Sequence, residues 1–429
     1  MEAIQVEGGH PITGEVRVEG AKNSALKLMA ATIMAPGTTT LTNVPDISDV
    51  HVMGKVLKRL GATIDVVDKH TLKIDTSQVD RWETPYQLVA QMRASTAVLG
   101  PLLARFGRAV VAMPGGCNIG ARKIDMHILG LEALGVHFEI GHGNIHATTP
   151  EGISGNTVTL DFASVGATEN LVMASVHAKG TTTIDNAARE PEIVDLATML
   201  NEMGAHVRGA GSPVIEIEGT DAPLHPVTHK TVGDRIEAGT FAAIGALVGG
   251  PVRVLGFDPH HLGLVFKKYA LMGIDIESED DGVIVSRTSA LRPTDIQTLP
   301  FPGFPTDMQA QTMCLLALAK GSCIVTENVF ENRFMFASEL SRMGADITIE
   351  GHHAIVHGVP RFSGAEVKAP DLRGGAALVM AGLVADGLTT VLDVHHIDRG
   401  YEAFVPKLAS LGARISRVQL PDEDLDYNG

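Results

Sequence analysis

The sequence predicts an α/β protein of two domains, each built from three repeats of about 70 residues. Three observations predict this fold class: the chain length and two interleaved series of glycines. A chain of 429 residues is longer than one hydrophobic core usually serves, which indicates two domains. A composition of 45% hydrophobic and 20% charged residues is typical of a soluble globular protein.

The first glycine series follows six segments whose apolar residues recur at three- and four-residue spacing, as on one face of a helix. The segments are KVLKRLGATI, LGLEALGVHF, TMLNEMGAHV, KYALMGIDI, SELSRMGADI and PKLASLGARI. Their glycines are Gly61, Gly135, Gly204, Gly273, Gly344 and Gly412, which lie 68 to 74 residues apart. Glycine ends a helix readily because it adopts the left-handed conformation. We therefore expect six amphipathic helices, each followed by a short strand.

The second series follows six more apolar segments, such as ALKLMAATIMAPG and AALVMAGLVADG. Its glycines are Gly37, Gly107, Gly180, Gly250, Gly321 and Gly387, which lie 66 to 73 residues apart. Helices that are apolar on all sides are expected to be buried. One repeat is therefore a strand, a buried helix, a strand, an amphipathic helix and a strand pair. Chance recurrence of a common helix–glycine–strand motif is the alternative, but two series with matched periods argue against it.

The repeats suggest where the domains divide. We expect a first domain over residues 22–231, which carries the loop around Cys117, and a second over residues 1–21 and 232–429. The initial strand is placed with the last repeats because chain termini often lie close together.

Charge and cysteine usage restrict the function. A net charge of −16 argues against a general binder of nucleic acid or anionic membranes. Cys117, Cys314 and Cys323 form no CxxC pair, which suits a reducing compartment. The chain has neither the pattern of a secretory signal nor an apolar run of roughly 18 residues. We therefore expect a cytoplasmic protein in which Cys314 and Cys323 belong to the core.

Cationic residues recur at the predicted starts of the buried helices, as in Lys22-Asn23-Ser24, Asp234-Arg235 and Asp371-Leu372-Arg373. A cation there is unfavourable by roughly 0.3–1 kcal/mol, so its recurrence indicates a compensating anion. The loops before the amphipathic helices carry more cations: Arg122, Arg189, Arg333 and Arg399. A single arginine is usually a solvated surface residue. Their equivalent positions in the repeat favour an anion-binding cleft instead.

Seven segments, in order along nearly the whole chain, resemble the signatures of the UDP-N-acetylglucosamine 1-carboxyvinyltransferase family. They are GAKNSALKLMAA, MPGGCNIGARKIDMHILGLEALG, SVGATENLVMAS, NAAREPEIVDLA, FPGFPTDMQAQ, ENRFMFASELSRMGA and HIDRGYE. The resemblance implies the enolpyruvyl transferase fold, a two-domain inverse α/β prism. It also implies transfer of the enolpyruvyl group of phosphoenolpyruvate to UDP-N-acetylglucosamine, the first committed step of peptidoglycan precursor synthesis. No metal or organic cofactor is implied, and we expect a monomer.

The same resemblance assigns roles residue by residue. Cys117, Asp307 and Lys22 match catalytic positions, and Cys117 also matches the cysteine that fosfomycin alkylates. The positions that match the phosphoenolpyruvate site are Lys22, Asn23, Arg122, Arg333, Arg373 and Arg399. The positions that match the sugar-nucleotide site are Arg93, Arg122, Lys123, Ile124, Asp125, Met126, Ser164, Val165, Gly166, Asp307 and Val329. The chain departs from common family residues at Ala97, Lys123 and Phe162, which bears on nucleotide packing.

Two of these residues have simpler interpretations that stay open. Asp307 is expected to act as the base near the sugar 3-hydroxyl, but it could instead only cap a helix. Cys117 is expected to donate a proton or to act in product release from a loop that its glycines leave free to move. The alternative is a buried small side chain. His395-His396 and the other histidines lack the closed ligand set of a metal site.

Two other functions also remain. The first is a 5-enolpyruvylshikimate-3-phosphate synthase-like enzyme, which shares the fold and the chemistry. The second is a non-catalytic paralogue that only binds the sugar nucleotide. Loss of Lys22, Cys117, Asp307 or Arg399 would favour the paralogue, yet all four are present.

Overall fold

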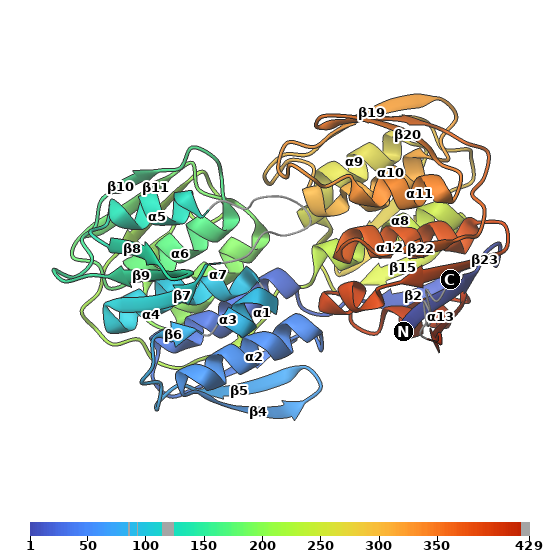
Figure 1. Cartoon of the computed structure of the whole chain (residues 1–429). Helices are drawn as coiled ribbons and strands as arrows, with labels where there is room; N and C mark the ends of the chain where they lie inside the picture. The colour runs from blue at the N-terminus through green and yellow to red at the C-terminus, as the bar shows by residue number, and fades with distance from the viewer. Residues whose placement is uncertain (85, 92, 114–123, 422–429) are drawn as a thin grey trace, which may run out of the picture.

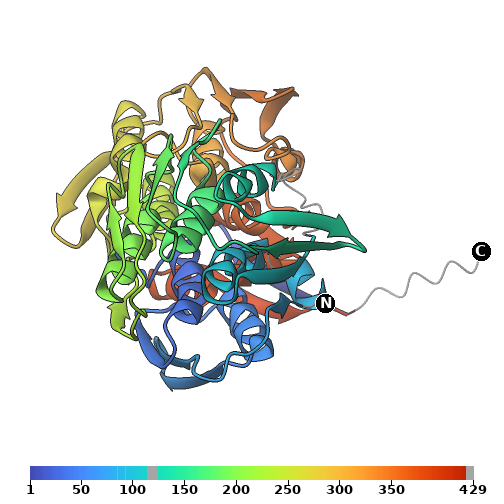
Figure 2. The same cartoon turned by 90° about the vertical axis from the view of Figure 1, so that its left-hand side faces the viewer.

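The computed structural model describes residues 1–84, 86–91, 93–113 and 124–421. These residues form two lobes that lie side by side (Figure 1), and Figure 2 views the molecule with the first lobe in front. Among the described residues, the strands form six four-stranded sheets, three in each lobe. The repeat architecture predicted from the glycine series is therefore confirmed.

Each sheet of the first lobe has four strands, given in their spatial order. They are β14(Thr228–Lys230)-β3(Thr38–Thr42)-β5(Thr71–Asp75)-β4(Thr63–Asp68), β6(Glu83–Thr84)-β7(Arg108–Ala112)-β9(Asn144–Thr148)-β8(His137–Gly141) and β10(Thr157–Thr159)-β11(Thr181–Asp185)-β13(Val214–Glu218)-β12(His206–Arg208). The sheets of the second lobe follow the same plan. They are β16(Asp275–Glu279)-β17(Gly282–Ser286)-β15(Val252–Leu255)-β2(Gly14–Arg17), β18(Ile296–Gln297)-β19(Ser322–Thr326)-β21(His353–His357)-β20(Asp346–Glu350) and β22(Glu366–Lys368)-β23(Leu388–Leu392)-β1(Glu2–Glu7)-β24(Arg414–Gln419).

Each sheet has one parallel strand pair, and its other two pairs are antiparallel. The parallel pair needs a long connection, and in four of the six sheets a buried helix supplies it. The partners in the β3–β14 and β2–β15 pairs are instead separated by more than 180 residues, because the chain crosses between the lobes there. In every sheet a buried helix precedes the inner strand of the parallel pair. These helices are α1(Lys22–Ala31), α4(Leu99–Phe106), α6(Val165–Ser175), α8(Arg235–Val248), α10(Gln309–Leu316) and α12(Leu372–Val384). Each lobe therefore has three sheets around three central helices.

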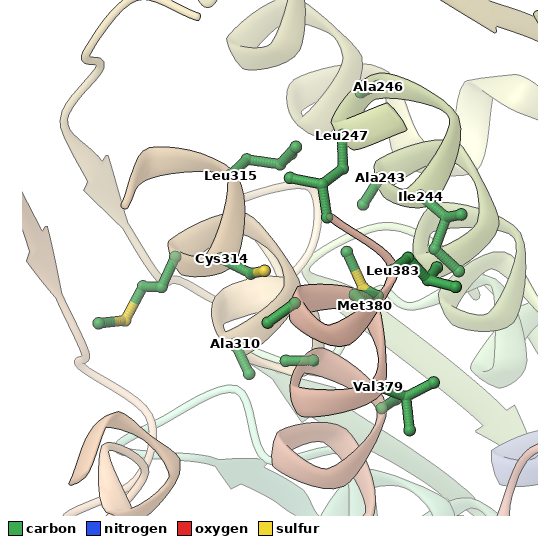
Figure 3. Packing of buried hydrophobic residues seen from close by; sticks show 14 of the residues in the cluster. Ala243, Ile244, Ala246, Leu247, Ala310, Cys314, Leu315, Val379, Met380 and Leu383 are labelled. Atoms are coloured by element: carbon green, nitrogen blue, oxygen red, sulfur yellow. The ribbon is translucent and has the colours of Figure 1, made fainter. Parts of the chain in front are cut away.

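The central helices of the second lobe pack against one another, which explains why their sequences are apolar on all sides. Ile244 and Leu247 of α8, Leu315 of α10, and Met380 and Leu383 of α12 point toward one another in Figure 3. All five are at most 3% exposed. Small residues such as Ala243 and Ala310 let the helices approach closely, which fits the low aromatic content of 4%. As predicted, Cys314 and Cys323 belong to this core.

The amphipathic helices lie outside the central ones. They are α2(Ser48–Leu60), α5(Asp125–Glu132), α7(Pro191–Glu202), α9(Gly263–Leu271), α11(Met335–Arg342) and α13(Phe404–Ser410). In α2 the apolar residues at positions 50, 53, 56, 57 and 60 are all buried, as their spacing predicts. Gly61 ends this helix with φ of 112°, a conformation that a residue with a side chain rarely adopts.

The chain passes between the lobes twice. β2 pairs with β15 of the second lobe, whereas α1, which follows β2, belongs to the first lobe. Conversely, β14 pairs with β3 of the first lobe and is followed by α8 of the second. Gly20 and Gly233 form a bridge between the two crossing segments. A Cβ atom on Gly20 would lie 1.8 Å from a backbone oxygen of the first lobe, and one on Gly233 would lie 1.9 Å from a backbone oxygen of the second, so neither position accepts a side chain.

The buried apolar side chains form two clusters. One spans residues 25–224, and the other combines residues 4–18 with residues 236–413. On this basis we propose that the domains are 22–231 and 1–21 with 232–429. A membrane-spanning helix, long and apolar enough for the purpose, does not occur in the described ranges.

Candidate active site

Asp234 connects the starts of two central helices from different lobes. Its carboxylate accepts hydrogen bonds from the backbone N–H groups of Ile236 at 2.8 Å and Glu237 at 2.9 Å, and so caps α8. It also accepts one at 3.1 Å from the N–H of Lys22, the first residue of α1. Because α1 has no side-chain cap of its own, Asp234 holds both helix starts at the crossing between the lobes.

Asp49, in the first turn of α2, lies between two of the predicted phosphoenolpyruvate-binding cations. Its carboxylate is 2.8 Å from Nζ of Lys22 and 3.0 Å from Nε of Arg399. Arg399 belongs to the 3₁₀ helix η5(Val394–Arg399) of the second lobe, so this ion pair joins the lobes. Gly400 makes room for Lys22, because a Cβ atom there would lie 3.1 Å from the Lys22 side chain.

The electrostatics of this cluster favour a further anion. Burial raises the pKa of Asp49, but Lys22 and Arg399 outweigh it, so the net pKa is lowered and the group is a carboxylate. Burial lowers the pKa of Lys22, and the positive charges of Arg399 and Arg373 lower it further, whereas the negative charge of Asp49 raises it. The net pKa is lowered. Two further cations, Arg399 and Arg373, therefore lie within electrostatic range of Lys22. A bound anion would relieve their repulsion and raise the pKa of Lys22.

Asp307 forms a second cluster with two buried arginines. It belongs to the 3₁₀ helix η4(Thr306–Met308), directly before α10. Arg333 donates a 2.8 Å hydrogen bond to one carboxylate oxygen, and Arg373 donates bonds of 3.0 and 3.3 Å to the other. Burial alone would raise the pKa of Asp307, yet Arg373 and Arg333 hold it far below its usual range. The carboxylate makes no capping bond to α10, whose N-cap is Met308, so the helix-cap interpretation does not describe it.

Each of these arginines keeps hydrogen-bonding capacity. Arg333 is 5% and Arg373 3% exposed. One terminal nitrogen of each, Nη1, is buried and has no hydrogen-bond partner among the residues that the structure describes. A buried donor without a partner is costly. The arrangement fits a site in which an anionic ligand completes the pairing of both guanidinium groups.

Further ion pairs join the lobes beside these clusters. Arg235, at the start of α8, pairs with Glu192 of α7 at 3.1 Å, and Glu190 accepts a 3.3 Å hydrogen bond from the N–H of Phe301. Burial raises the pKa of Glu190. Neighbouring carboxylates therefore line the first-lobe side of the crossing, opposite the arginines of the second lobe.

The predicted nucleotide-binding residues of the first lobe gather at two adjacent helix starts. Ser164 caps α6, where its hydroxyl accepts a 3.4 Å bond from the N–H of Ala167, and Val165 and Gly166 form the first turn. Ile124 is the N-cap of α5, and Asp125 and Met126 follow it. A Cβ atom on Gly166 would lie 3.1 Å from His127 of α5, so glycine permits the close approach of the two helices.

His127 and its neighbours fix that approach. Its Nδ1 lies 3.0 Å from the side-chain nitrogen of Asn170 on α6. Burial lowers the pKa of His127 to about 4, with Lys27 contributing, so the ring is neutral near pH 7. Backbone N–H groups at two adjacent helix starts can bind a phosphate, and a neutral histidine adds no positive charge there.

The remaining predicted positions are distributed as follows. Asn23 is exposed beside Lys22, and Val329 follows β19 in the second lobe. Ala97 is 2% exposed in the core of the first lobe, whereas Phe162 is 36% exposed. Arg93 begins the 3₁₀ helix η2(Arg93–Val98), and its side chain is outside the described part of the structure. Cys117, Arg122 and Lys123 also lie outside the described residues.

Sequence reasoning missed Asp49, although a signal was present. The repeats place arginines in the loops before their amphipathic helices, at Arg122, Arg189, Arg333 and Arg399. The first repeat has the acidic segment PDISDVH there instead. A carboxylate at the position where other repeats carry an arginine suggests that it pairs with one of those cations. Within the described ranges, no three His, Cys, Asp or Glu side chains gather as a metal site.

Comparison with known proteins shows which family the chain belongs to. The sequence pattern of the family described as EPSP synthase (3-phosphoshikimate 1-carboxyvinyltransferase) matches residues 6–408. The UDP-N-acetylglucosamine 1-carboxyvinyltransferase 2 of Carboxydothermus hydrogenoformans is 52% identical over 420 residues, which cover 97% of this chain and 100% of that protein. The UDP-N-acetylglucosamine 1-carboxyvinyltransferase of Mycobacterium tuberculosis is 51% identical over 417 residues, covering 97% and 99%.

A solved structure extends the similarity to the fold. The enolpyruvyl transferase NikO from Streptomyces tendae superposes with a TM-score of 0.88 at 28% identity, covering 98% of this chain and 99% of that one. The inverse α/β prism expected from the resemblance is thereby confirmed. The chain belongs to the EPSP synthase family of enolpyruvyl transferases and, within it, to the UDP-N-acetylglucosamine 1-carboxyvinyltransferases.

Proposed function

We propose that this protein transfers the enolpyruvyl group of phosphoenolpyruvate to the 3-hydroxyl of UDP-N-acetylglucosamine and releases phosphate. The observation that carries the proposal is the clustering of positive charge where the lobes meet. Four cationic side chains, Lys22, Arg333, Arg373 and Arg399, share the carboxylates of Asp49 and Asp307. Phosphoenolpyruvate carries a phosphate and a carboxylate, which are the two kinds of anion that such a cluster binds. The reaction is the first committed step of peptidoglycan precursor synthesis, and we place it in the cytoplasm, carried out by a monomer.

The reaction proceeds by addition and elimination. C3 of phosphoenolpyruvate gains a proton while the sugar 3-oxygen forms a bond to C2 and gives its proton to a base. The tetrahedral adduct then loses a proton from C3, and the bond between C2 and the phosphate oxygen breaks. The products are the enolpyruvyl ether and phosphate. We assign the proton transfer at C3, or the release of product, to Cys117.

Asp307 is assigned as the base, and its pairing sets the order of events. While both arginines hold it, its lowered pKa makes it a weak proton acceptor. When the substrate anion recruits Arg333 and Arg373, their hold on the carboxylate weakens and its basicity rises. Binding of phosphoenolpyruvate would therefore activate the base for the sugar hydroxyl. Lys22 and Arg399, paired with Asp49, are assigned to the phosphate of the same substrate.

The nucleotide is assigned to both lobes. The starts of α5 and α6, with Ile124, Asp125, Met126, Ser164, Val165 and Gly166, would bind the diphosphate and uridine end. The sugar would then extend toward Asp307 and Val329 of the second lobe. A substrate that contacts both lobes explains why several ion pairs cross between them.

The two alternative functions are less well supported. EPSP synthase from Acinetobacter baumannii is 19% identical to this chain with a TM-score of 0.76, which is a likeness of fold alone. A non-catalytic paralogue would have no need of Asp307 held between two buried arginines. The buried, charge-paired cluster is expensive to maintain without a ligand.

The deciding experiment is phosphate release from phosphoenolpyruvate by the purified protein with each of two acceptors. We expect release with UDP-N-acetylglucosamine and none above background with shikimate 3-phosphate. Release with shikimate 3-phosphate alone would support the synthase-like function. Binding of UDP-N-acetylglucosamine without phosphate release would support the non-catalytic paralogue.

A further inference from the structure

Glu327 lies directly after β19 and connects two turns that carry proposed substrate contacts. Its side chain is 3% exposed. One carboxylate oxygen accepts hydrogen bonds from the backbone N–H groups of Val329 at 2.8 Å and Phe330 at 3.1 Å, and from the hydroxyl of Thr298 at 2.9 Å. The other oxygen accepts a 2.9 Å bond from the hydroxyl of Thr306, the residue before Asp307. A single carboxylate therefore holds the turn at Val329 and the turn at Asp307.

Comparison among the repeats of this chain shows that Glu327 departs from the common pattern. The equivalent position lies six residues after the glycine that precedes the central strand. In chain order the six repeats have Asn43, Met113, Asn186, Gly256, Glu327 and Asp393 there. Asn43, Asn186 and Asp393 have φ values of 55°, 56° and 55°, a left-handed conformation in which asparagine and aspartate are tolerated. Glu327 does not adopt that conformation.

In two repeats the asparagine at this position bonds its neighbouring strand. Asn43 donates a side-chain hydrogen bond to the carbonyl of Thr231, and Asn186 donates one to the carbonyl of Leu160. In the fifth repeat that bond is made one residue later, by Asn328 to the carbonyl of Thr298. The strand end is thus secured without Glu327. The Glu327 carboxylate can therefore bond to the turns at Asp307 and Val329 instead.

We propose that Glu327 is a positioning residue that fixes the Asp307 turn and the Val329 turn relative to each other. The proposal rests on the proposed function, because it gives these turns the sugar 3-hydroxyl and the nucleotide as ligands. Gly256 also has a positive φ, 97°, so the pattern is broken in the second repeat, at Met113, and in the fifth, at Glu327. Of these two repeats, only the fifth carries Asp307 and Val329. A carboxylate that accepts four hydrogen bonds holds such turns more rigidly than a side chain that accepts one or two.

The two arms of the network predict different kinetic effects. Thr306→Val removes only the bond to the Asp307 turn, so kcat should fall about tenfold, with KM for UDP-N-acetylglucosamine within about twofold of wild type. Glu327→Asn restores the residue type of the first and third repeats and is too short to serve both turns. It should lower kcat about 10–100-fold and raise KM for UDP-N-acetylglucosamine about fivefold. KM for phosphoenolpyruvate should change less than KM for the nucleotide, because three of the four cations assigned to it, Lys22, Arg373 and Arg399, lie on α1, α12 and η5 rather than on the two turns.

Asp295→Asn provides the matched control. Asp295 belongs to the same repeat, and its side chain accepts a 2.8 Å bond from the N–H of Ile324. Among the described residues, its hydrogen bonds go to Ile324 and Lys268 and not to either turn. Steady-state phosphate release and thermal unfolding are measured for wild type and the three variants. The control should lose stability at most and keep both kinetic constants.

The outcomes separate three explanations. Wild-type kcat in Thr306→Val, or wild-type kcat and nucleotide KM in Glu327→Asn, would overturn the positioning role. Equal losses in all three variants would overturn it too, since they would reflect a general loss of folded protein. If Glu327→Asn fails to fold, the Thr306→Val arm still decides. Failure of the wild-type protein to release phosphate with UDP-N-acetylglucosamine would instead refute the proposed function.

Discussion

Replacing Asp307 by asparagine tests the assigned base most directly, because the change keeps size and removes charge. The carboxylate accepts three hydrogen bonds from Arg333 and Arg373. Asparagine offers one oxygen, so its NH₂ group would face the N–H groups of one arginine. Two donors cannot form a hydrogen bond with each other. Turnover should fall by about 10²–10⁴ because the sugar hydroxyl loses its proton acceptor. Binding of UDP-N-acetylglucosamine should be largely kept.

The cost to stability follows from the same contacts. One or two charge-assisted hydrogen bonds are lost, each contributing about 1.5–3 kcal/mol. Asp307 is a quarter exposed, so solvent screening reduces the loss. We expect the free energy of unfolding to fall by about 2–3 kcal/mol, leaving a folded protein in which the loss of turnover reports on chemistry.

The assay combines phosphate release at saturating substrates with calorimetric titration of UDP-N-acetylglucosamine. Thermal unfolding shows that the variant is folded. Near-normal turnover in the folded variant would refute the reasoning, since Asp307 would then serve only to hold the two arginines. Loss of nucleotide affinity in proportion to turnover would make it a binding residue.

Three further predictions concern other groups. Lys22→Met and Arg399→Met should each weaken phosphoenolpyruvate binding by about 1.5–3 kcal/mol in titration, and unchanged affinity would place that residue outside the anion site. Fosfomycin with UDP-N-acetylglucosamine should give one adduct by peptide mass spectrometry, on Cys117, because the two other cysteines are buried; label on either of those would contradict the loop assignment. Burial raises the pKa of Glu237 to about 7 despite the pairing with a lysine at 2.8 Å. Between pH 4.5 and 7 the folded state binds more protons than the unfolded state. The free energy of unfolding therefore falls as the pH rises through that range. Relative to Glu237→Gln, wild type should lose about 3 kcal/mol between pH 4.5 and 8 in urea unfolding, and parallel pH curves would refute this.

Much of the fold was predictable because it depends on local patterns. The glycines that end helices, the three- and four-residue spacing in α2 and the fully apolar α12 each have one structural solution, repeated along the chain. The chain crossing at Gly20 and Gly233 was harder. β14 completes a sheet whose other strands lie more than 150 residues earlier, and no local pattern specifies such a partner.

The candidate site, like the fold, was only partly predictable from the sequence. The recurrent positions of cations at helix starts and in loops predicted an anion-binding cleft, and the resemblance to the family assigned Lys22, Arg333, Arg373 and Arg399 to it. Only the tertiary structure decided how they are paired. Asp49 meets Lys22 and Arg399 because α2 and η5 approach each other across the lobes, and Asp307 meets two arginines from different repeats. The residue type gives the sign of a side chain's charge. Which partner it pairs with, and its pKa, depend on distance and burial, which long-range packing sets.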